Sequence, residues 1–326
     1  MKLCLRCGFS FQGANWKCPS CGWMPQSVDG FIAFAPELAE NNDYYETEHH
    51  GRLAALENGN FWFRARNELI LWALDKFFPQ AQTILEVGCG TGFVLKALED
   101  SHPDVALVGT EIHVSGLEVA RRRVTARTEL VQLDAASLPF RDEFDVAGVF
   151  DVIEHINDDE KVLGEIAKAL KAGGGLLVSV PHHAFLWSEI DKVSRHVRRY
   201  STSELIDKVR RGGFEIIFVT SFSSLLLPLM VFSRRICRRK ADEELLFKQF
   251  LIPHWMNFLF EKTLGFERFL IKSGVTFPFG GSLFLVARKA GEIAESSAVK
   301  SEEVSASMPK AGSPSEFDAI RKLDQV

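Results

Sequence analysis

The chain has 326 residues, of which 46% are hydrophobic and 25% charged, with a formal net charge of −5. This balance is ordinary for a globular protein, and it excludes a wholly disordered chain, a collagen and a coiled coil. The small acidic excess gives no overall bias toward nucleic acid. Thirteen of the 27 Phe lie between Phe214 and Phe284, so this region has a special apolar task.

The start of the chain shows no secretory signal, because residues 1–25 lack an apolar segment and carry four cysteines. The longest uncharged stretch, Ile216–Ser233, has 18 residues but contains Pro228 and five Ser or Thr. A membrane-spanning helix needs about 20 mostly apolar residues, so this stretch predicts a strand, a turn and a short helix. We therefore expect a cytoplasmic protein, either free or bound peripherally to the inner face of the membrane.

Two Cys-x2-Cys pairs open the chain: Cys4 with Cys7 and, after ten intervening residues, Cys18 with Cys21. A glycine follows each pair and lets backbone amides turn toward the sulfurs. Four thiolates aimed at one point suit a tetrahedral zinc ion, and the pattern resembles a zinc ribbon; an iron centre is the alternative. Because four protein ligands close the site, we expect structural zinc that supplies folding energy to residues 1–25.

The rest of the chain divides into a connector (residues 26–82), a domain (residues 83–289) and a tail (residues 290–326). The connector ends in an expected helix, Asn60–Phe78, whose apolar residues recur at helical spacing. The tail is rich in Ser, Ala, Glu and Lys, so we expect it to be disordered apart from a short helix near Phe317–Leu323.

Within the domain, expected strands alternate with expected helices. The strands are Ile84–Gly88, Val105–Glu111, Glu129–Asp134, Phe144–Asp151, Gly175–Pro181, Phe214–Phe222 and Gly280–Lys289. The helices between them are Phe93–Glu99, Ser115–Arg127, Asp158–Lys171 and Ser201–Gly212. This alternation favours an α/β fold, a Rossmann-like parallel sheet with helices on both faces. Residues 223–278 are interpreted as a Phe-rich helical insertion before the last strand.

A glycine-rich loop follows the first of these strands, with Gly88, Gly90 and Gly92 at alternate positions and Glu86 two residues before them. Glycines at such a turn let the backbone approach a ligand that side chains would exclude. A phosphate-binding loop would continue with Lys and Ser or Thr, and a dinucleotide loop has a G-x-G-x-x-G spacing. Neither is present here. Cys89, between the first two glycines, is expected to fill a small position.

This loop resembles that of class I S-adenosylmethionine-dependent methyltransferases, and the resemblance covers residues 83–289. It implies a seven-stranded sheet and a cofactor site at the strand ends. Glu111 would bind the ribose hydroxyls, and the next residue, Ile112, would also contact the cofactor. Asp134 would bind the adenine amino group and the backbone of Ala135 the ring, while Asp151 would lie beside the methionine part and the substrate.

A hydroxyl acceptor for a methyl group needs a base or a metal to remove its proton. The segment from Asp151 to Glu154 and His155 resembles the E-x-x-E-H segment of ubiquinone-pathway O-methyltransferases, where two acids and the His are associated with a divalent metal. Asp151 replaces the first acid here. Three interpretations stay open: His155, with Glu154, as base or substrate contact; a divalent metal at these three residues; or His155 as a packing residue.

A second polar cluster follows the fifth strand of the domain and contains His196, Arg198, Arg199 and Tyr200. Loops after strands in such folds line the active site, so His196 is a further catalytic candidate. The arginines either grip an anionic group of the substrate or form a solvated basic surface.

The insertion is flanked by charge, since residues 192–240 hold twelve Lys or Arg and three acids. Basic residues beside apolar ones suit an anionic membrane surface, a lipid-linked substrate or, less well, RNA; an ordinary helical cap is the alternative.

We therefore weigh three functions: a methyltransferase for a small-molecule or lipid-linked acceptor, acting on oxygen; an RNA methyltransferase with a ribbon on the nucleic acid; and a non-catalytic scaffold. The domain lacks the Asn-Pro-Pro-Tyr segment of many amino-group methylating enzymes, which disfavours the second. The intact glycine loop disfavours the third. The sequence leaves the oligomeric state open.

Overall fold

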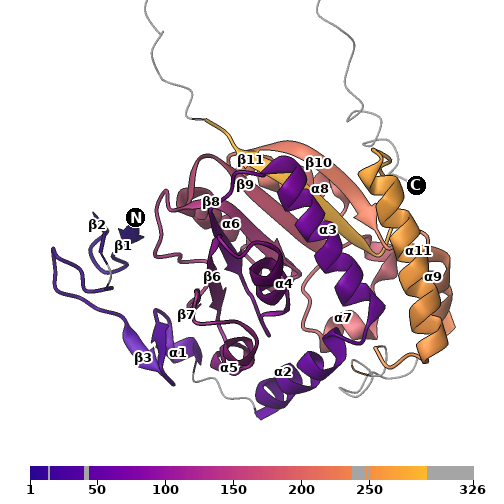
Figure 1. The fold of residues 1–326 in the computed structure, drawn as a ribbon, viewed down its shortest axis with the longest axis horizontal. Coiled ribbons are helices and arrows are strands. Elements are labelled where there is room, and N and C mark those ends of the chain that lie inside the picture. Colours follow the sequence, from indigo (N-terminus) through magenta and orange to yellow (C-terminus); the bar gives the residue numbers. More distant parts are fainter. Residues whose placement is uncertain (14, 40–43, 237–246, 248–249, 292–326) are drawn as a thin grey trace, which may run out of the picture.

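The computed structural model describes residues 1–13, 15–39, 44–236, 247 and 250–291 (Figure 1). The expected disordered tail therefore lies outside the described residues from residue 292 onward. A nine-stranded sheet forms the centre of the described chain, and a two-stranded ribbon lies at its N-terminal end.

The two strands of the ribbon are β1 (Lys2–Leu3) and β2 (Ser10–Phe11). The strands of the central sheet are β3 (Gln26–Val28), β4 (Phe31–Ala33), β5 (Thr83–Val87), β6 (Ala106–Glu111), β7 (Thr128–Gln132), β8 (Phe144–Phe150), β9 (Leu170–Pro181), β10 (Phe214–Phe222) and β11 (Ser282–Lys289). The helices are α1 (Pro36–Ala39), α2 (Tyr44–Glu57), α3 (Phe61–Phe77), α4 (Phe93–Ser101), α5 (Val114–Arg123), α6 (Asp159–Ala169), α7 (Glu189–Val193), α8 (Thr202–Arg211), α9 (Leu227–Ile236) and α11 (His254–Lys272). Short 3₁₀ turns cover Ile153–His155 and Ala184–Leu186.

The sheet order is β10-β11-β9-β8-β5-β6-β7-β4-β3. Strands β7, β6, β5, β8 and β9 pair in parallel, whereas β11 runs antiparallel to both of its neighbours. All seven strands expected in the domain are present, and the α/β prediction is confirmed. The chain order reverses direction between β5 and β8, the position at which ligands bind in open α/β sheets, at the carboxyl ends of the strands.

The connector adds two strands that the sequence did not predict. Strand β4 pairs in parallel with β7, with Ile32 opposite Val131, and β3 pairs with β4. Both strands have three residues, which is too short for an alternating hydrophobic pattern to be recognised. The connector therefore extends the sheet beyond β7 instead of only linking two units.

Two hydrophobic clusters pack on the two faces of the sheet. One contains Leu163 of α6, Leu205 of α8 and, from the ribbon, Trp16. The other contains Leu69 of α3 and Leu95 of α4, together with residues of α5 and α11. Helices thus cover both faces, as the near-continuous apolar strands require. Figure 1 shows α3 crossing in front of the sheet and α11 at the side opposite the ribbon.

Residues 223–278 contain α9 and α11. No helix among the described residues is long and apolar enough to cross a membrane. Helix α11 packs along α3, and the Arg64 guanidinium of α3 donates two hydrogen bonds to Glu261 of α11, at 2.9 and 2.8 Å.

Candidate functional site

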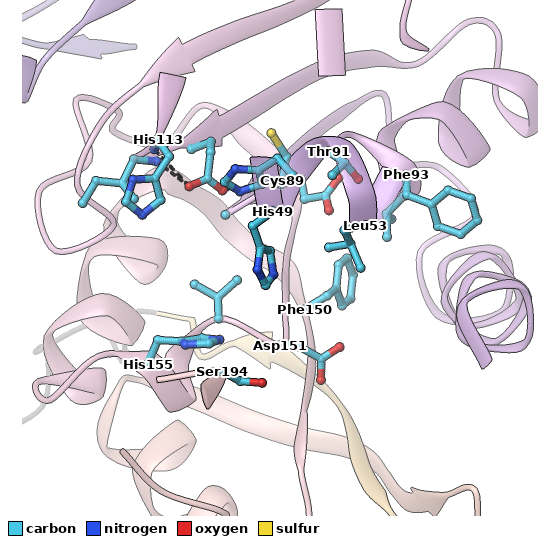
Figure 2. Close-up of a pocket in the computed structure, with 18 of the residues that line it drawn as sticks. His49, Leu53, Cys89, Thr91, Phe93, His113, Phe150, Asp151, His155 and Ser194 are labelled. Carbon is cyan, nitrogen blue, oxygen red and sulfur yellow. Dashed lines mark hydrogen bonds between the residues drawn. The ribbon is translucent and has the colours of Figure 1, made fainter. Parts of the chain in front are cut away.

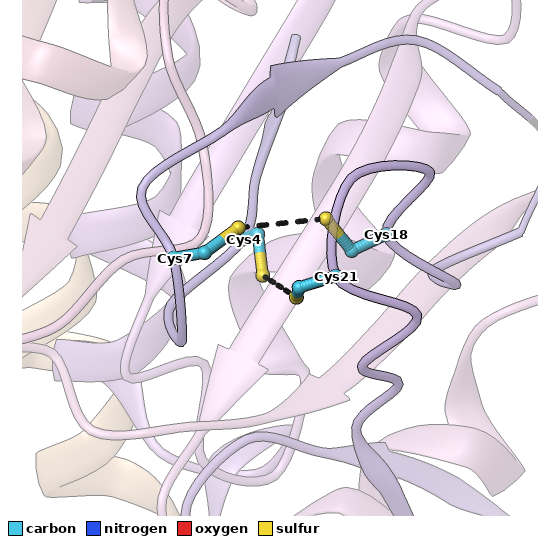
Figure 3. Close-up of side chains that lie close together, drawn as sticks. All are labelled: Cys4, Cys7, Cys18 and Cys21. Atoms are coloured by element: carbon cyan, nitrogen blue, oxygen red, sulfur yellow. Dashed lines mark hydrogen bonds between the residues drawn. The ribbon is translucent and has the colours of Figure 1, made fainter.

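The four cysteines of the ribbon converge on one point (Figure 3). Their sulfurs all lie within 4.8 Å of one another, and the sulfur distances are 3.7 Å for Cys4 to Cys21 and 3.7 Å for Cys7 to Cys18. A zinc ion with about 2.3 Å bonds to four sulfurs would separate them by roughly 3.8 Å. None of the cysteines that the structure describes forms a disulfide, so the arrangement fits a tetrahedral metal.

Each cysteine pair closes a turn of the same form. The amide of Gly8 donates to the carbonyl of Cys4 at 2.8 Å, and that of Gly22 to Cys18 at 2.9 Å. Both glycines have φ near +72°, at +73° and +72°, a conformation that glycine adopts without a side-chain penalty. The local backbone thus presents the sulfurs without help from a large core.

The ribbon is anchored to the domain through Trp16, which is 5% exposed. Its ring contacts Phe34 of the connector and Phe140 after β7, with centroids 4.8 and 5.7 Å apart. Its Nε1 donates to Glu129 of β7 at 3.3 Å. The ribbon and the edge of the sheet therefore form one packed unit.

A pocket of about 640 Å³ lies where the strands β5, β6, β7 and β8 end (Figure 2). It is lined by every predicted cofactor residue except Gly92, and by His155 and His196 of the predicted catalytic set. Helix α2 forms another wall, and Figure 2 shows its His49 projecting between the glycine loop and Asp151. The strand ends thus bring together residues that are far apart in the sequence.

The glycine loop leaves its backbone open to the pocket. A Cβ atom on Gly90 would meet nothing within 4 Å, whereas one on Gly88 would lie 2.5 Å from Val152 and one on Gly92 2.8 Å from Ala120. Close packing therefore requires glycine at Gly88 and Gly92, whereas the Cα of Gly90 faces the open space of the pocket. Cys89 is buried, and burial raises the pKa of its thiol well above the ordinary value, so it is no nucleophile at neutral pH.

Glu111 ends β6 and bridges two loops. One carboxylate oxygen accepts the amide of Gly90 at 2.9 Å, and the other accepts the amides of Ile112 at 2.9 Å and His113 at 3.1 Å. Gln132 of β7 holds the same loop, because its Nε2 donates to the carbonyl of Ile112 at 3.0 Å. These bonds fix the carboxylate at the pocket wall.

Glu86 is 3% exposed, and its Oε2 has no hydrogen-bond partner. Burial raises its pKa to about 8, and Glu111 adds to the rise. A buried oxygen without a partner is costly, so this carboxylate is suited to a ligand with a positive charge. Two residues after β7, Asp134 accepts the amide of Ala136 at 2.9 Å and, with Ala135, lines the adjoining part of the pocket.

Asp151 follows β8 with φ +56°, a left-handed conformation that is uncommon outside glycine. Its Oδ2 forms an ion pair with Arg66 of α3 and accepts a hydrogen bond from Ser179 at 3.2 Å. The sequence did not single out Arg66. The helical pattern showed the apolar face of α3 but carried no signal for which polar residue reaches a strand end.

Glu154 is fully buried, and neither of its carboxylate oxygens has a hydrogen-bond partner. His155 Nε2 and His196 Nε2 each lie 4.0 Å from its Oε1. Burial raises the pKa of Glu154 well above its ordinary value, and the charge of Asp151 adds to the rise. Burial lowers the pKa of His155 to about 4, helped by the neighbouring His196, so His155 is neutral at pH 7.

These three residues form the second group in the described chain that could hold a metal ion. The set differs from the expected one: His196 takes the place of Asp151, whose carboxylate is paired with Arg66. The expectation of Asp151, Glu154 and His155 as ligands was therefore wrong in one member. Two His and one carboxylate suit a divalent transition metal.

A buried ion pair orients His196. Its Nδ1 lies 3.1 Å from Oδ1 of Asp191, and the Nε of Arg199 donates to the same oxygen at 2.6 Å. Burial alone would raise the pKa of Asp191, but the hydrogen bond of His196 and the charge of Arg199 outweigh it and lower the pKa below its usual range. An ionised Asp191 fixes the ring orientation and leaves Nε2 for the pocket.

The remaining members of this polar cluster point inward. Arg198 donates to Asp159 at 2.7 Å, and the Tyr200 hydroxyl donates to the same Oδ2 at 2.6 Å. Both interpretations of the arginines, an anion grip and a solvated surface, were therefore wrong, because Arg198 and Arg199 are engaged in internal ion pairs. A run of basic residues in sequence does not reveal buried acids that come from another element.

Helix α2 is fastened to the glycine loop by a network the sequence did not predict. Thr91 Oγ1 donates to Glu57 at 2.8 Å and accepts from Arg123 of α5 at 2.9 Å, and Arg123 forms an ion pair with Glu57. This network closes the side of the pocket next to the loop.

Comparison with known proteins agrees with this geometry. Residues 85–178 match the methyltransferase domain family. An O-methyltransferase from Pyrenophora dematioidea is 28% identical over 181 residues, covering 51% of this chain and 66% of that protein. A Mycolicibacterium smegmatis protein, described as an inferred S-adenosylmethionine-dependent methyltransferase, is 29% identical over 167 residues, covering 50% and 63%. The chain thus spans less than two thirds of the length of these relatives.

The fold is also found in an inferred methyltransferase from Haloferax volcanii, solved in complex with a methyltransferase activator. The TM-score is 0.51 at 18% identity, over 78% of this chain and 98% of that one. Fold, strand order and glycine loop define a domain of the S-adenosylmethionine-dependent methyltransferase class.

Proposed function

We propose that this chain transfers a methyl group from S-adenosylmethionine to a hydroxyl oxygen of a small-molecule or lipid-linked acceptor. The observation that carries the proposal is the pocket that joins the glycine loop and the orphaned Glu86 carboxylate to the Asp191–His196 pair. Relatives named O-methyltransferase support oxygen as the acceptor atom.

The residues present fit the cofactor. The open backbone at Gly90 leaves room for it, Glu111 with Ile112 would bind the ribose, and Asp134 with Ala135 would bind the adenine. Glu86 offers its unpartnered oxygen to the cationic part of the molecule. The cofactor supplies an already activated methyl group. The protein therefore mainly has to align donor and acceptor and exclude water.

His196 is the proposed base. Asp191 holds its Nδ1, so Nε2 is free to take the proton of an acceptor hydroxyl in the pocket. His155, whose pKa burial lowers to about 4, adds no positive charge that would oppose the imidazolium that forms. The buried Glu154 lies 4.0 Å from the Nε2 of His196. Asp151, held by Arg66, borders the acceptor side of the pocket.

A divalent metal at Glu154, His155 and His196 is a second candidate for activating the acceptor. The two unpartnered oxygens of the buried Glu154 favour it. When bound there, such an ion would lower the pKa of a coordinated hydroxyl. The ribbon cysteines would hold structural zinc. We further propose a cytoplasmic location and domain limits at residues 25, 82 and 289.

The test is transfer of radiolabelled methyl from S-adenosylmethionine into a cell extract of the source organism, followed by separation into lipid, RNA, protein and small-molecule fractions. We expect label in the lipid or small-molecule fraction, in a linkage whose hydrolysis identifies a methyl ether or ester. Label in RNA alone would replace the proposal with nucleic-acid methylation. Absence of transfer with folded, zinc-loaded protein would favour the scaffold.

A further inference from the structure

Helix α11 exposes a row of large apolar side chains. Trp255, Phe258, Leu259, Phe266 and Phe269, here called the aromatic face, are between 52% and 67% exposed. Their spacing of three, four, eleven and fourteen residues from the first places them on one side of the helix. The opposite side packs inward with Leu264 and Ile271, which are fully buried. Five such residues on one helix exceed the scattered exposure that is ordinary for a protein surface.

The apolar surface continues beyond α11. Leu225, Leu229 and Phe232, in and before α9, are 41%, 44% and 63% exposed. The amide of Leu225 donates to Glu267 of α11 at 2.9 Å, so the start of this segment is fixed to α11. Figure 1 draws α9 and α11 at the same side of the molecule, opposite the ribbon.

The charged side chains of α11 differ in their exposure according to sign. Its two acids are engaged elsewhere: Glu261 is paired with Arg64 of α3, and Glu267 is fully buried. Lys262 and Lys272 are exposed, and Lys262 Nζ lies 5.2 Å from the ring centroid of Phe258. The helix thus presents aromatic rings together with two cations, while Glu261 is held in an ion pair by Arg64 and Glu267 is buried.

We propose that the aromatic face docks the protein on the surface of an anionic lipid bilayer. Aromatic and leucine side chains enter the headgroup boundary, while Lys262 and Lys272 approach lipid phosphates. A second copy fits less well, because pairing two such faces brings the lysines together without a counter-charge. RNA would require a denser positive charge than two lysines provide.

Membrane docking is consistent with the proposed function. Only one part of it, the entry of a lipid-linked acceptor into the pocket, rests on that function. Phe250 lines the pocket, and its carbonyl accepts a hydrogen bond from Asn60 at 3.2 Å. Phe61, the residue after Asn60, donates its amide to Oδ1 of Asn257 of α11 at 2.8 Å. The wall of the pocket is thus joined to the first turn of the helix that carries the aromatic face.

The experiment is vesicle flotation with the zinc-loaded full chain. Vesicles of neutral phosphatidylcholine are compared with vesicles in which about a third of the lipid is anionic phosphatidylglycerol. We expect flotation with the anionic vesicles and a loss of at least about tenfold in binding for a Phe258→Ser, Phe269→Ser double variant, since two aromatic rings that leave water on docking are replaced by polar side chains. Lys262→Glu should weaken binding to anionic vesicles only.

Met24→Ser is the matched control, because Met24 is 60% exposed on the ribbon and should leave flotation unchanged. Equal flotation of the wild type and the double variant would overturn the proposal. Two other results would also overturn it if neither protein floats. One is a dimer of the wild type, seen by light scattering, that the double variant does not form, and the other is RNA binding that the double variant abolishes. S-adenosylmethionine binding, measured by calorimetry and retained by the double variant, separates docking from the proposed function.

Discussion

Replacing Glu86 by Gln should stabilise the protein without its cofactor, and the effect should depend on pH. Glu86 is buried with one carboxylate oxygen lacking a hydrogen-bond partner, so its ionised form is disfavoured in the folded state. Unfolding exposes the carboxyl group to water and restores its ordinary pKa. The folded state therefore binds a proton that the unfolded state has released, and stability falls as the pH rises through this window.

The magnitude follows from the two pKa values. The pKa of Glu86 rises from 4.5 to about 8, and one pKa unit corresponds to about 1.4 kcal/mol. The wild type should lose about 1.4 kcal/mol per pH unit through Glu86 between pH 4.5 and 8, reaching about 5 kcal/mol above pH 8. Gln does not titrate, so the variant lacks this loss.

The assay is urea unfolding of the wild type and Glu86→Gln at pH 5, 6, 7, 8 and 9, without cofactor. We expect the difference in unfolding free energy to move in favour of the variant up to about pH 8 and then level off. Any effect of the amide on stability that does not depend on pH cancels, because only the change of this difference with pH is used. A difference that is independent of pH would refute the reasoning.

Glu99 offers a control with the opposite sign. It is 5% exposed, and although burial opposes ionisation, hydrogen bonds from Thr128 and Thr125 lower its pKa. The stabilisation by ionised Glu99 is therefore present at neutral pH and is lost as the pH falls, so Glu99→Gln should destabilise the protein at pH 7.

Glu86→Gln should also weaken S-adenosylmethionine binding roughly 10- to 100-fold, the value of a hydrogen bond between charged groups, while Glu99→Gln should not.

Three further outcomes test the ribbon and the base. Chelation of the metal should unfold the ribbon, since structural zinc supplies about 10 kcal/mol or more; unchanged protease resistance of residues 1–25 after chelation would contradict this. Trp16→Ala should lower the unfolding free energy by about 3–5 kcal/mol, and a loss below about 1 kcal/mol would show that the ring does not anchor the ribbon. His196→Gln should reduce kcat by about 10²–10⁴-fold with unchanged cofactor affinity, and Asp191→Asn should shift the pH profile of kcat; an unaltered kcat in both would remove His196 as the base.

The sequence predicted those parts of the site that lie at strand ends. Long apolar runs predicted where β5, β6 and β8 end, and a polar residue in or directly after the last two positions of each strand had to lie near the same edge of the sheet. This is why Glu86, Glu111 and Asp151 line one pocket. The glycine spacing could be interpreted because backbone conformation at such a turn depends on local sequence.

The missed features depend on contacts between distant segments. The ion pair of Arg66 with Asp151 joins residues 85 positions apart, and no local pattern marks it. Arg198 looked exposed until the fold brought Asp159, 39 positions earlier in the chain, to it. Strands β3 and β4 are recognisable only through the pairing of β4 with β7 and of β3 with β4, because three residues are too few to show a period.

The most direct test of the cofactor site is calorimetric titration of S-adenosylmethionine into the zinc-loaded wild type and a Gly90→Arg variant. A Cβ atom at Gly90 would meet nothing within 4 Å, so the arginine side chain would enter the pocket. Because the φ of +50° at this position strains any residue other than glycine, circular dichroism first checks that the variant is folded. We expect one S-adenosylmethionine bound per wild-type chain, no measurable binding to the variant, and one zinc per chain in both. Equal binding to the variant, or none to the folded wild type, would contradict the assignment of this pocket.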